Sequence, residues 1–321
     1  MQLTEKQPAK EVQHMPAQFP MRRFGVVASF LALALIFSSL LAACGTTPTG
    51  SSGNCTVGGT SFDTSKFNLA VNNQLTVASD TTYPPQEFQD PNNPSQYIGF
   101  DLDIIREIGK RICLGSTVVQ PTNFDSIITG LTTPALGHQR YDLSISAFSI
   151  TPDRQQKVDM VPYFQAGESL LVANGNPQNI QSLNDLCGKT VAVEKATVEL
   201  DELNKLNAAG GACASKNANI LSFTSQDDVI TQLLNGRAVA TYQDSPVTGY
   251  YVTKNPGKVQ QGPITVAPSP EGIVMRKDNP QLELAVKKAL CSMQQDGKYT
   301  SILNQWGQQS GGIPASQFVC S

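Results

Sequence analysis

The stretch YDLSISAFSITPDRQQKVDMVPYF, residues 141–164, is the part of the chain on which the interpretation of the rest depends. Residues 143–149 are a short, largely apolar run between turn-forming residues, which predicts a buried strand. The Thr-Pro-Asp sequence at 151–153 supplies an N-cap residue, a proline suited to the first helical position and an acid suited to the first turn. A helix is therefore predicted to begin here, with Arg154 in its first turn.

This strand-to-helix junction contains groups that bind anions. The N-terminus of a helix has free N–H groups and the positive end of the helix dipole. Arg154 adds two parallel donors that suit a carboxylate, and the hydroxyls of Ser149 and Thr151 lie close by in the sequence. The simpler alternative is a capped surface helix whose Arg154 pairs with a neighbouring acid, so the rest of the chain has to decide.

The N-terminal segment predicts export. Arg22 and Arg23 precede an apolar run over residues 24–41, which ends in small residues. This order is typical of a secretory signal. A membrane span is the less favoured alternative, because the run is at the lower limit of length and no basic residues follow it. Residues 1–43 are predicted to be the signal peptide, with Met1 or Met21 as the start and with general or twin-arginine export both open.

The sequence Leu-Ala-Ala-Cys at 41–44 resembles the lipobox of bacterial lipoproteins, in which the cysteine is lipidated and becomes the first residue. Cys44 is therefore the predicted lipidation site. Residues 44–65 are predicted to be a flexible tether, because residues 45–59 are rich in Gly, Ser and Thr. These features place the exported chain at the extracytoplasmic face of the cell membrane, held by its lipid.

Six of the seven cysteines remain when Cys44 carries a lipid. An even number in an exported chain suggests disulfides, although six cysteines allow 15 pairings. Proximity in the sequence favours Cys187–Cys213 and Cys291–Cys320, which leaves Cys55–Cys113. Free buried thiols are the alternative for some of them.

Composition excludes several classes of function. The formal net charge of −3 at pH 7 is nearly neutral, so a nucleic-acid-binding protein is not indicated. The sequence contains no CxxC motif and no Cys/His cluster, so we predict no metal and no cofactor.

Predicted strands and helices alternate in two successive units. The first has a strand at 75–79, helices at 101–112 and 124–131, and the strand at 143–149. After a break at 175–177, the second unit has a strand at 189–193, a helix around 200–203, a helix at 227–234 and a strand at 238–242. Extended segments at 263–268 and 272–275 and helices around 282–293 and 302–306 complete the chain. This alternation predicts an α/β protein with parallel sheets in two lobes.

Polar residues follow four of the predicted strands. They are Asp80 with Tyr83, residues 149–154, residues 194–197, and Asp244. Ligands of open α/β sheets bind beyond the carboxyl ends of the strands, so these groups are predicted to meet in one cleft between the lobes. An arginine with hydroxyls suits a carboxylate, and an isolated aspartate suits an ammonium. Together they suit an α-amino acid, which favours the functional interpretation of Arg154.

The chain also resembles the bacterial extracellular solute-binding proteins of family 3, the polar amino-acid receptors of ABC importers. The matching stretches are SDTTYPPQEF (79–88), IGFDLDIIREI (98–108), FDSIITGL (124–131), residues 141–164 quoted above, LCGKTVAVEKAT (186–197), QLLNGRAVATYQDSP (232–246) and GIVMRKDNPQLELAVKKAL (272–290). They occur in the family's order and spacing and extend over most of residues 75–306.

The resemblance implies a two-lobe fold of the type II periplasmic-binding-protein kind, with mixed, mostly parallel sheets and two hinge strands near 165–169 and 266–271. The first lobe would comprise residues 66–165 and 268–321, and the second residues 166–267. It implies that the chain is no enzyme but a monomeric receptor. Such a receptor captures a free amino acid by hinge closure and delivers it to the transmembrane subunits of the permease.

The resemblance also implies roles for individual residues. Arg154 and Ser149 would hold the α-carboxylate, Asp244 the α-ammonium, Tyr83 and Phe124 the flanks of the side chain, Asp80 and Ser146 its polar end, and Thr197 a contact from the second lobe. For the two aromatic residues, a place in the hydrophobic core is the alternative.

Three positions depart from the family pattern. Ala196 stands where the family often has Gly, and Val198 where it has a small or hydroxyl residue, so the backbone donors beside Thr197 could be placed differently. Glu194 stands where relatives often have Gln or Lys. Together with Asp80 it favours a cationic ligand such as arginine or lysine, unless Glu194 points to solvent.

Two other functions are alternatives. Some relatives with this fold are cyclohexadienyl or arogenate dehydratases, and Asp80 or Glu194 could act as a proton donor. His138 is the one histidine after the predicted signal peptide and lies in a Gly/Gln-rich loop, so no His-dependent catalytic triad is predicted. The sensing ectodomain of a receptor or a glycan-cleaving fusion is the second alternative, and either would require further domains or a second membrane span.

Overall fold

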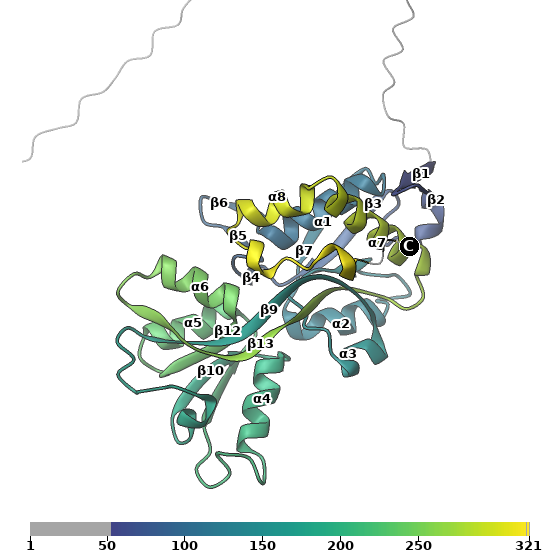
Figure 1. Cartoon of the computed structure of the whole chain (residues 1–321). Coiled ribbons are helices and arrows are strands. Elements are labelled where there is room, and N and C mark those ends of the chain that lie inside the picture. The colour runs from purple at the N-terminus through teal and green to yellow at the C-terminus, as the bar shows by residue number, and fades with distance from the viewer. Residues whose placement is uncertain (1–52, 319, 321) are drawn as a thin grey trace, which may run out of the picture. The chain divides into compact units, whose positions relative to one another are not determined.

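The computed structural model describes residues 53–318 and Cys320 (Figure 1). The predicted signal peptide, the lipidation site Cys44 and the first part of the tether lie outside these residues. Within the described part of the chain, no helix combines the length and the apolarity that crossing a bilayer requires.

An eight-stranded mixed sheet runs through the described residues, in the order β11-β10-β12-β9-β13-β8-β3-β7. The bounds along the chain are β3 Gln74–Ser79, β7 Ser116–Pro121, β8 Leu143–Ser144, β9 Asp159–Ala173, β10 Thr190–Glu194, β11 Asn219–Phe223, β12 Ala240–Asp244 and β13 Val259–Met275. β3 pairs in parallel with β7 and β8, and β10 pairs in parallel with β11 and β12. The long strands β9 and β13 pair antiparallel between these two parallel units (Figure 1). The predicted two-lobe α/β fold with two connecting strands is therefore confirmed.

Helices cover each parallel unit. In the first lobe these are α1 Phe100–Arg111, α2 Phe124–Thr132, α3 Pro152–Lys157, α7 Pro280–Gln295 and α8 Lys298–Gln305; in the second they are α4 Val198–Asn207, α5 Gln226–Leu234 and α6 Ser245–Lys254. The short 3₁₀ helices are Thr64–Phe67, Leu183–Leu186, Gln309–Gly311 and Ala315–Gln317. Smaller strands are β1 Asn54–Val57, β2 Thr60–Asp63, β4 Thr82–Tyr83, β5 Glu87–Asp90 and β6 Asn93–Ile98.

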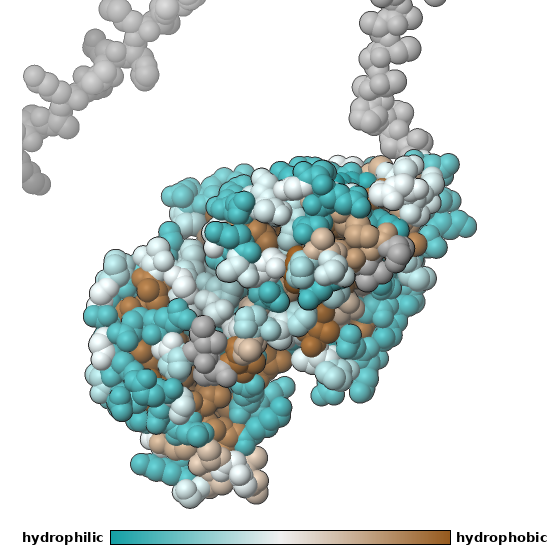
Figure 2. All heavy atoms as spheres, viewed as in Figure 1, coloured by the Kyte–Doolittle hydropathy of each residue, from teal (hydrophilic) through white to brown (hydrophobic). Residues whose placement is uncertain are grey.

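Apolar periodicity explains how the helices pack. The predicted face of α1, with Leu102, Ile105 and Ile108, is fully buried. Residues of α7, such as Leu282 and Val286, join the same core as α1, so the C-terminal segment returns to the first lobe after β13. On the face that Figure 2 shows, hydrophilic residues cover much of the surface, with apolar residues visible between them.

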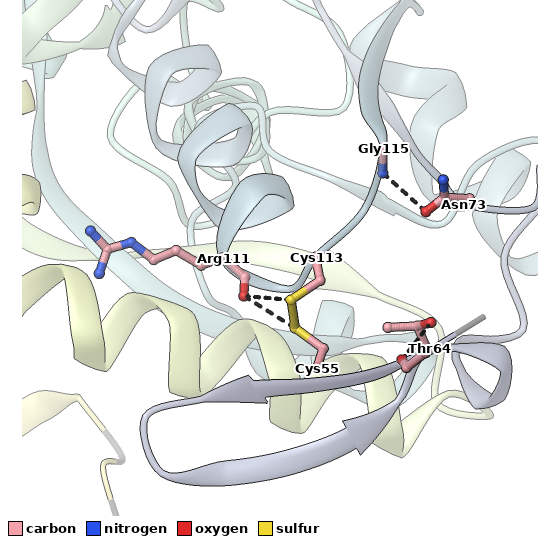
Figure 3. Close-up of a disulfide and its surroundings, with 7 residues drawn as sticks. Cys55, Thr64, Asn73, Arg111, Cys113 and Gly115 are labelled. Carbon is pink, nitrogen blue, oxygen red and sulfur yellow. Dashed lines mark hydrogen bonds between the residues drawn. A yellow bond between two sulfur atoms is a disulfide. The ribbon is translucent and has the colours of Figure 1, made fainter. Parts of the chain in front are cut away.

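The hairpin β1–β2 belongs to the first lobe. Cys55 and Phe62 are buried in the core that also contains α1 and α7, because apolar residues alternate along β1. The Cys55–Cys113 disulfide ties the hairpin to the end of α1, where the two sulfur atoms lie 3.5 and 3.8 Å from the carbonyl oxygen of Arg111 (Figure 3). Residues 54–63 are thus folded, and not part of a flexible tether as predicted for residues 44–65.

Two further disulfides join Cys187 to Cys213 and Cys291 to Cys320. The first closes a loop in the second lobe, and the other ties α7 to the C-terminal segment. These are the two pairs that proximity in the sequence favoured, and Cys55–Cys113 is the pair that they left over.

The predicted strand over residues 143–149 is shorter in the structure. β8 ends at Ser144, and the left-handed backbone of Ala147, with φ 46°, does not continue an extended strand. A carboxylate oxygen of Asp101 accepts the Ala147 N–H at 3.3 Å. Ile145 and Phe148 are nevertheless buried, as the pattern predicted.

Candidate functional site

One cleft between the lobes contains every residue of the predicted site. A small cavity of about 10 Å³ is lined by Asp80, Tyr83, Glu87, Phe124, Ser146, Ala147, Ser149, Arg154, Glu194, Thr197, Val198, Glu199 and Asp244. The first eight come from the first lobe, and the last five follow β10 or end β12 in the second lobe. The carboxyl ends of the strands therefore meet where the sequence predicted.

Arg154 extends across this cleft from the first turn of α3. Thr151 caps this helix by accepting the Arg154 N–H at 3.3 Å. The guanidinium donates from Nη1 to the Ser149 carbonyl at 2.8 Å and from Nη2 to the Ala196 carbonyl of the second lobe at 3.1 Å. Its carbon atom lies 5.4 Å from the centre of the Phe124 ring and 5.1 Å from that of Phe148. These contacts fix the plane of the guanidinium.

The charge of Arg154 is not paired with an acid in the described part of the chain, where no carboxylate oxygen lies within 4.0 Å of it. Burial lowers its pKa, while the negative charges of Glu199 and Asp244 oppose this shift. The arginine–acid pair of the alternative interpretation is therefore not found among the described residues, although α3 itself is a surface helix without a buried residue.

Asp80 is held by the backbone around it. Its Oδ2 accepts the Phe124 N–H at 2.9 Å, and its Oδ1 accepts the Thr82 hydroxyl at 2.6 Å and the Thr82 N–H at 3.1 Å. The Ser146 hydroxyl accepts the Asp80 N–H at 2.9 Å and donates to Glu87 at 2.7 Å. Burial raises the pKa of Asp80, and the hydrogen bonds from Thr82 and Phe124 oppose that shift.

Glu194 lies in the cleft and not in solvent, since only 3% of it is exposed. Its Oε1 has no hydrogen-bond partner among the described residues. Burial, followed by the negative charge of Asp80, raises the pKa of Glu194 well above its usual value. Asp80 and Glu194 thus form a carboxyl pair that spans the two lobes.

The turn before α4 contains Ala196, one of the positions that depart from the family pattern. Ala196 has φ 61°, the left-handed conformation that glycine adopts most easily. The Thr197 hydroxyl caps α4 by accepting the Leu200 N–H at 3.2 Å, and it donates to the Glu194 carbonyl at 2.9 Å. Thr197 therefore shapes the turn, and its hydroxyl is already used within the second lobe.

Tyr83 and Asp244 meet across the cleft. The Tyr83 hydroxyl donates to Asp244 Oδ2 at 2.9 Å and accepts the Asp244 N–H at 3.1 Å. Burial raises the pKa of Asp244 to about 7, although the Tyr83 hydrogen bond and the Arg154 charge act in the opposite direction. Sequence reasoning placed both residues in the site but did not predict their contact.

The two aromatic residues also serve the packing of the protein. Phe124 stacks on Phe148 with ring centres 4.3 Å apart, within a hydrophobic cluster of the first lobe. Tyr83 belongs to a cluster with Ile230 and Val247 of the second lobe. Each ring therefore both lines the cleft and contributes to a core.

Two acids of the cleft, Glu87 and Glu199, were not predicted. Burial raises the pKa of each well above its usual value, and one oxygen of each lacks a hydrogen-bond partner among the described residues. Glu199 occupies the first turn of α4, where an acid is common for helix stability alone. Its sequence position therefore gave no functional indication.

The lining is strongly acidic. Five carboxyl groups, those of Asp80, Glu87, Glu194, Glu199 and Asp244, share the cleft with one guanidinium. Buried carboxylates are unfavourable unless paired or protonated, so this arrangement can bind a group with net positive charge.

Comparison with known proteins gives the family. A profile described as bacterial extracellular solute-binding proteins, family 3, matches residues 75–309. The chain belongs to this family.

Several relatives of this solute-binding protein are named for amino acids. The histidine-binding periplasmic protein of Escherichia coli K12 is 29% identical over 244 residues, and the lysine/arginine/ornithine-binding periplasmic protein of the same strain is 30% identical over 252 residues. Each alignment covers 74% of this chain and 88% of the relative. These relatives are binding proteins, which favours that function over the dehydratase alternative.

A solved structure of an ancestral arginine-binding protein bound to arginine is 32% identical to this chain, with a TM-score of 0.66. The match covers 73% of this chain and 98% of that one. The ancestral arginine-binding protein bound to glutamine matches with the same identity and TM-score, over 74% of this chain and 99% of that one. These neighbours confirm the two-lobe fold.

Proposed function

We propose that this chain is the substrate-binding component of an ABC importer and that it captures a cationic L-amino acid between its lobes. The excess of buried carboxyl groups over guanidinium in the cleft carries this proposal. The α-carboxylate and α-ammonium of an amino acid balance the charges of Arg154 and of one acid. The remaining carboxyl groups must then be either protonated or paired with a cationic side chain of the ligand. The names of the lysine/arginine/ornithine-binding relative and of the ancestral arginine-binding protein agree with this charge balance.

In this proposal the ligand backbone lies between Arg154 and Asp244. The planar guanidinium, held by the carbonyls of Ser149 and Ala196, presents its remaining donors to the α-carboxylate. Asp244, at the end of β12, accepts the α-ammonium. The two charged ends of an amino acid are thus fixed from opposite lobes, which gives the ligand different affinities for open and closed states.

The cationic side chain of the ligand then lies near Asp80 and Glu194, with Ser146 beside them. Glu194 Oε1 lacks a partner among the described residues, so it is free to accept from a guanidinium or ammonium. The rings of Tyr83 and Phe124 flank the aliphatic part. Thr197 contributes by shaping the turn that carries Glu194.

Closure is proposed to occur about β9 and β13, between a first lobe of residues 66–165 and 268–321 and a second lobe of residues 166–267. The folded hairpin at 54–63 extends the first lobe towards the N-terminus. We further propose a monomer that is exported and anchored by a lipid on Cys44. Cys44→Ser tests this anchor, because the variant cannot carry the lipid and is expected to lose its association with the membrane.

Isothermal titration calorimetry with the protein from residue 45 onward tests the ligand class. Arginine, lysine, histidine and glutamine are titrated at pH 7.5. We expect arginine or lysine to bind at least about tenfold more tightly than glutamine, the equivalent of about 1.4 kcal/mol. Tightest binding of glutamine or another neutral amino acid would contradict the cationic assignment, and no binding of any amino acid would contradict the proposed function.

A further inference from the structure

One hydroxyl group connects the acidic end of the cleft to a helix of the opposite lobe. Thr82, on β4 of the first lobe, donates from Oγ1 to Asp80 Oδ1 at 2.6 Å. The same Oγ1 accepts the backbone N–H of Gln226, the first residue of α5, at 3.1 Å. Asp80 lines the cleft and α5 belongs to the second lobe, so this pair of hydrogen bonds crosses between lobes.

Helix α5 does not cap its own N-terminus with a side chain. Ser225 occupies the N-cap position, but its side chain makes no cap hydrogen bond. The first N–H groups of a helix have no partner within the helix and need an acceptor from elsewhere. Thr82 supplies one of these acceptors from the other lobe. The Gln226 N–H therefore has this acceptor only when the lobes are together.

Residues close to Thr82 in the sequence also contact the second lobe. The Tyr83 hydroxyl bonds to Asp244, and the Tyr83 ring packs in a cluster with Ile230 of α5 and Val247 of α6. Phe88, on β5, lies with its ring centre 5.5 Å from that of Tyr250 on α6. The segment containing β4 and β5 is thus the part of the first lobe that docks on α5 and α6, and Thr82 provides its polar contact with α5.

We propose that Thr82 is a positioning residue that couples Asp80 in the cleft to closure of the second lobe through this cross-lobe helix cap. The inference rests on the proposed function. A cationic ligand group beside Asp80 favours the ionised carboxylate, and hydrogen bonds to an ionised acceptor are the stronger ones. The Thr82 hydroxyl then donates its hydrogen to the Asp80 carboxylate. The lone pairs of the same hydroxyl oxygen are left to accept the Gln226 N–H. Ligand charge at this end of the cleft is thereby transmitted to α5.

The chain offers a variant on each side of the contact. Thr82→Val removes the hydroxyl and keeps the branched shape, while Thr82→Ser keeps the hydroxyl. Gln226→Pro removes the donated N–H without touching the first lobe. Proline is tolerated at a first helical position, and the extended backbone of Ser225, with φ −141° and ψ 133°, suits the residue before a proline. Gln226→Ala is its control, because it loses the same side chain and keeps the N–H.

Arginine affinity and dissociation rate, measured by stopped-flow fluorescence, test the coupling. We expect Thr82→Val to weaken binding about tenfold, mostly through faster dissociation, and Thr82→Ser to match the native protein. Gln226→Pro should weaken binding by a similar factor relative to Gln226→Ala. Thr82→Val and Gln226→Pro both remove the hydrogen bond from the Gln226 N–H to the Thr82 hydroxyl. Thr82→Val combined with Gln226→Pro should therefore bind arginine no more weakly than Thr82→Val combined with Gln226→Ala.

Additive losses of arginine affinity in the double variant of Thr82→Val and Gln226→Pro would overturn the inference. An unchanged rate of arginine dissociation in both single variants would also overturn it. Small-angle scattering provides a readout that does not need a ligand, since loss of the cap is expected to enlarge the radius of gyration. If the native protein binds no amino acid, the proposed function fails. An unchanged radius of gyration in both variants refutes, independently of ligand binding, the role of the cap in holding the lobes together. Should Thr82→Val not fold, Thr82→Ala takes its place.

Discussion

The Tyr83 hydroxyl donates to Asp244 Oδ2 at 2.9 Å and accepts the Asp244 N–H at 3.1 Å, so one side chain of the first lobe satisfies both polar groups of a second-lobe residue. A contact of this kind exists only when the lobes are together. It also leaves the other oxygen of Asp244 for a ligand ammonium in the proposed complex.

Tyr83→Phe is therefore expected to weaken arginine binding about tenfold, because it removes both hydrogen bonds and keeps the ring in its cluster. Calorimetry measures the change. Tyr97→Phe is the matched control, since Tyr97 lies on β6 and is not among the residues lining the cleft. Equal affinities for Tyr83→Phe and the native protein would show that the contact does not contribute to closure.

Arg154→Lys keeps the positive charge and loses the planar fork. The lysine ammonium cannot donate in one plane to the Ser149 carbonyl, the Ala196 carbonyl and a carboxylate. It also stacks less well than a guanidinium on the Phe148 ring. We expect arginine affinity to fall roughly a hundredfold, with little change in melting temperature. Arg237→Lys, at an exposed position, is the control. Retained affinity in Arg154→Lys would rule out bidentate carboxylate binding.

Glu194→Gln tests the side-chain end of the cleft separately from Arg154. The substitution removes the carboxyl group that a cationic ligand would ionise and leaves the size of the residue almost unchanged. The affinity for arginine should fall about tenfold or more, while that for glutamine should stay the same or rise. Titrations of both amino acids measure this ratio. A parallel loss for both would assign Glu194 a structural role only.

Much of this arrangement was predictable because local chemistry determines it. The Thr151–Pro152 pair set the start of α3, and apolar spacing set the buried face of α1, so Arg154 and Asp80 could be placed at strand ends from the sequence alone. The hairpin at 54–63 was missed, since its Gly- and Ser-rich surroundings conceal a short alternation that the Cys55–Cys113 disulfide and contacts with α7 stabilise.

What could not be predicted are the contacts that depend on the closed lobes. Nothing near Thr82 in the sequence points to Gln226, which lies 144 residues away. Glu199 lies in the first turn of α4, where an acid is common, and only the tertiary approach of Asp244 and Arg154 makes it part of the cleft. Tertiary placement, not residue type, determines these roles.

Stability is expected to fall as the pH rises from about 4 to about 7. Burial raises the pKa of Asp101 to about 7, and it raises the pKa values of its neighbours Glu87 and Glu271 well above the usual range. These groups face one another and the Tyr163 hydroxyl, with Ser146 and Gln86 as further donors. In this pH window the folded protein thus binds more protons than the unfolded chain. The free energy of unfolding therefore falls as the pH rises and these buried carboxyl groups ionise.

Calorimetric melting of the ligand-free protein between pH 4.5 and 8 measures this dependence. The melting temperature should decline through this window, with the contribution of Asp101 complete near pH 7, and Asp101→Asn should flatten the slope. The exposed acids with lowered pKa values, such as Asp63 and Asp296, act in the opposite sense but only below about pH 4. A melting temperature that rises steadily from pH 4.5 to 7 would contradict this account.

Ala196 has a left-handed backbone that glycine would adopt without a steric penalty. At φ 61° a residue with a Cβ is destabilised by about 1–2 kcal/mol, whereas glycine costs about 0.5–1 kcal/mol through the freedom of the unfolded chain. Ala196→Gly should therefore raise the melting temperature by about 1–2 °C. Ala192→Gly, in the interior of β10, is the control and should lower it. Because the Ala196 carbonyl receives Arg154 Nη2, arginine affinity should be kept in Ala196→Gly, and a marked loss would mean that the alanine methyl itself holds the turn in place.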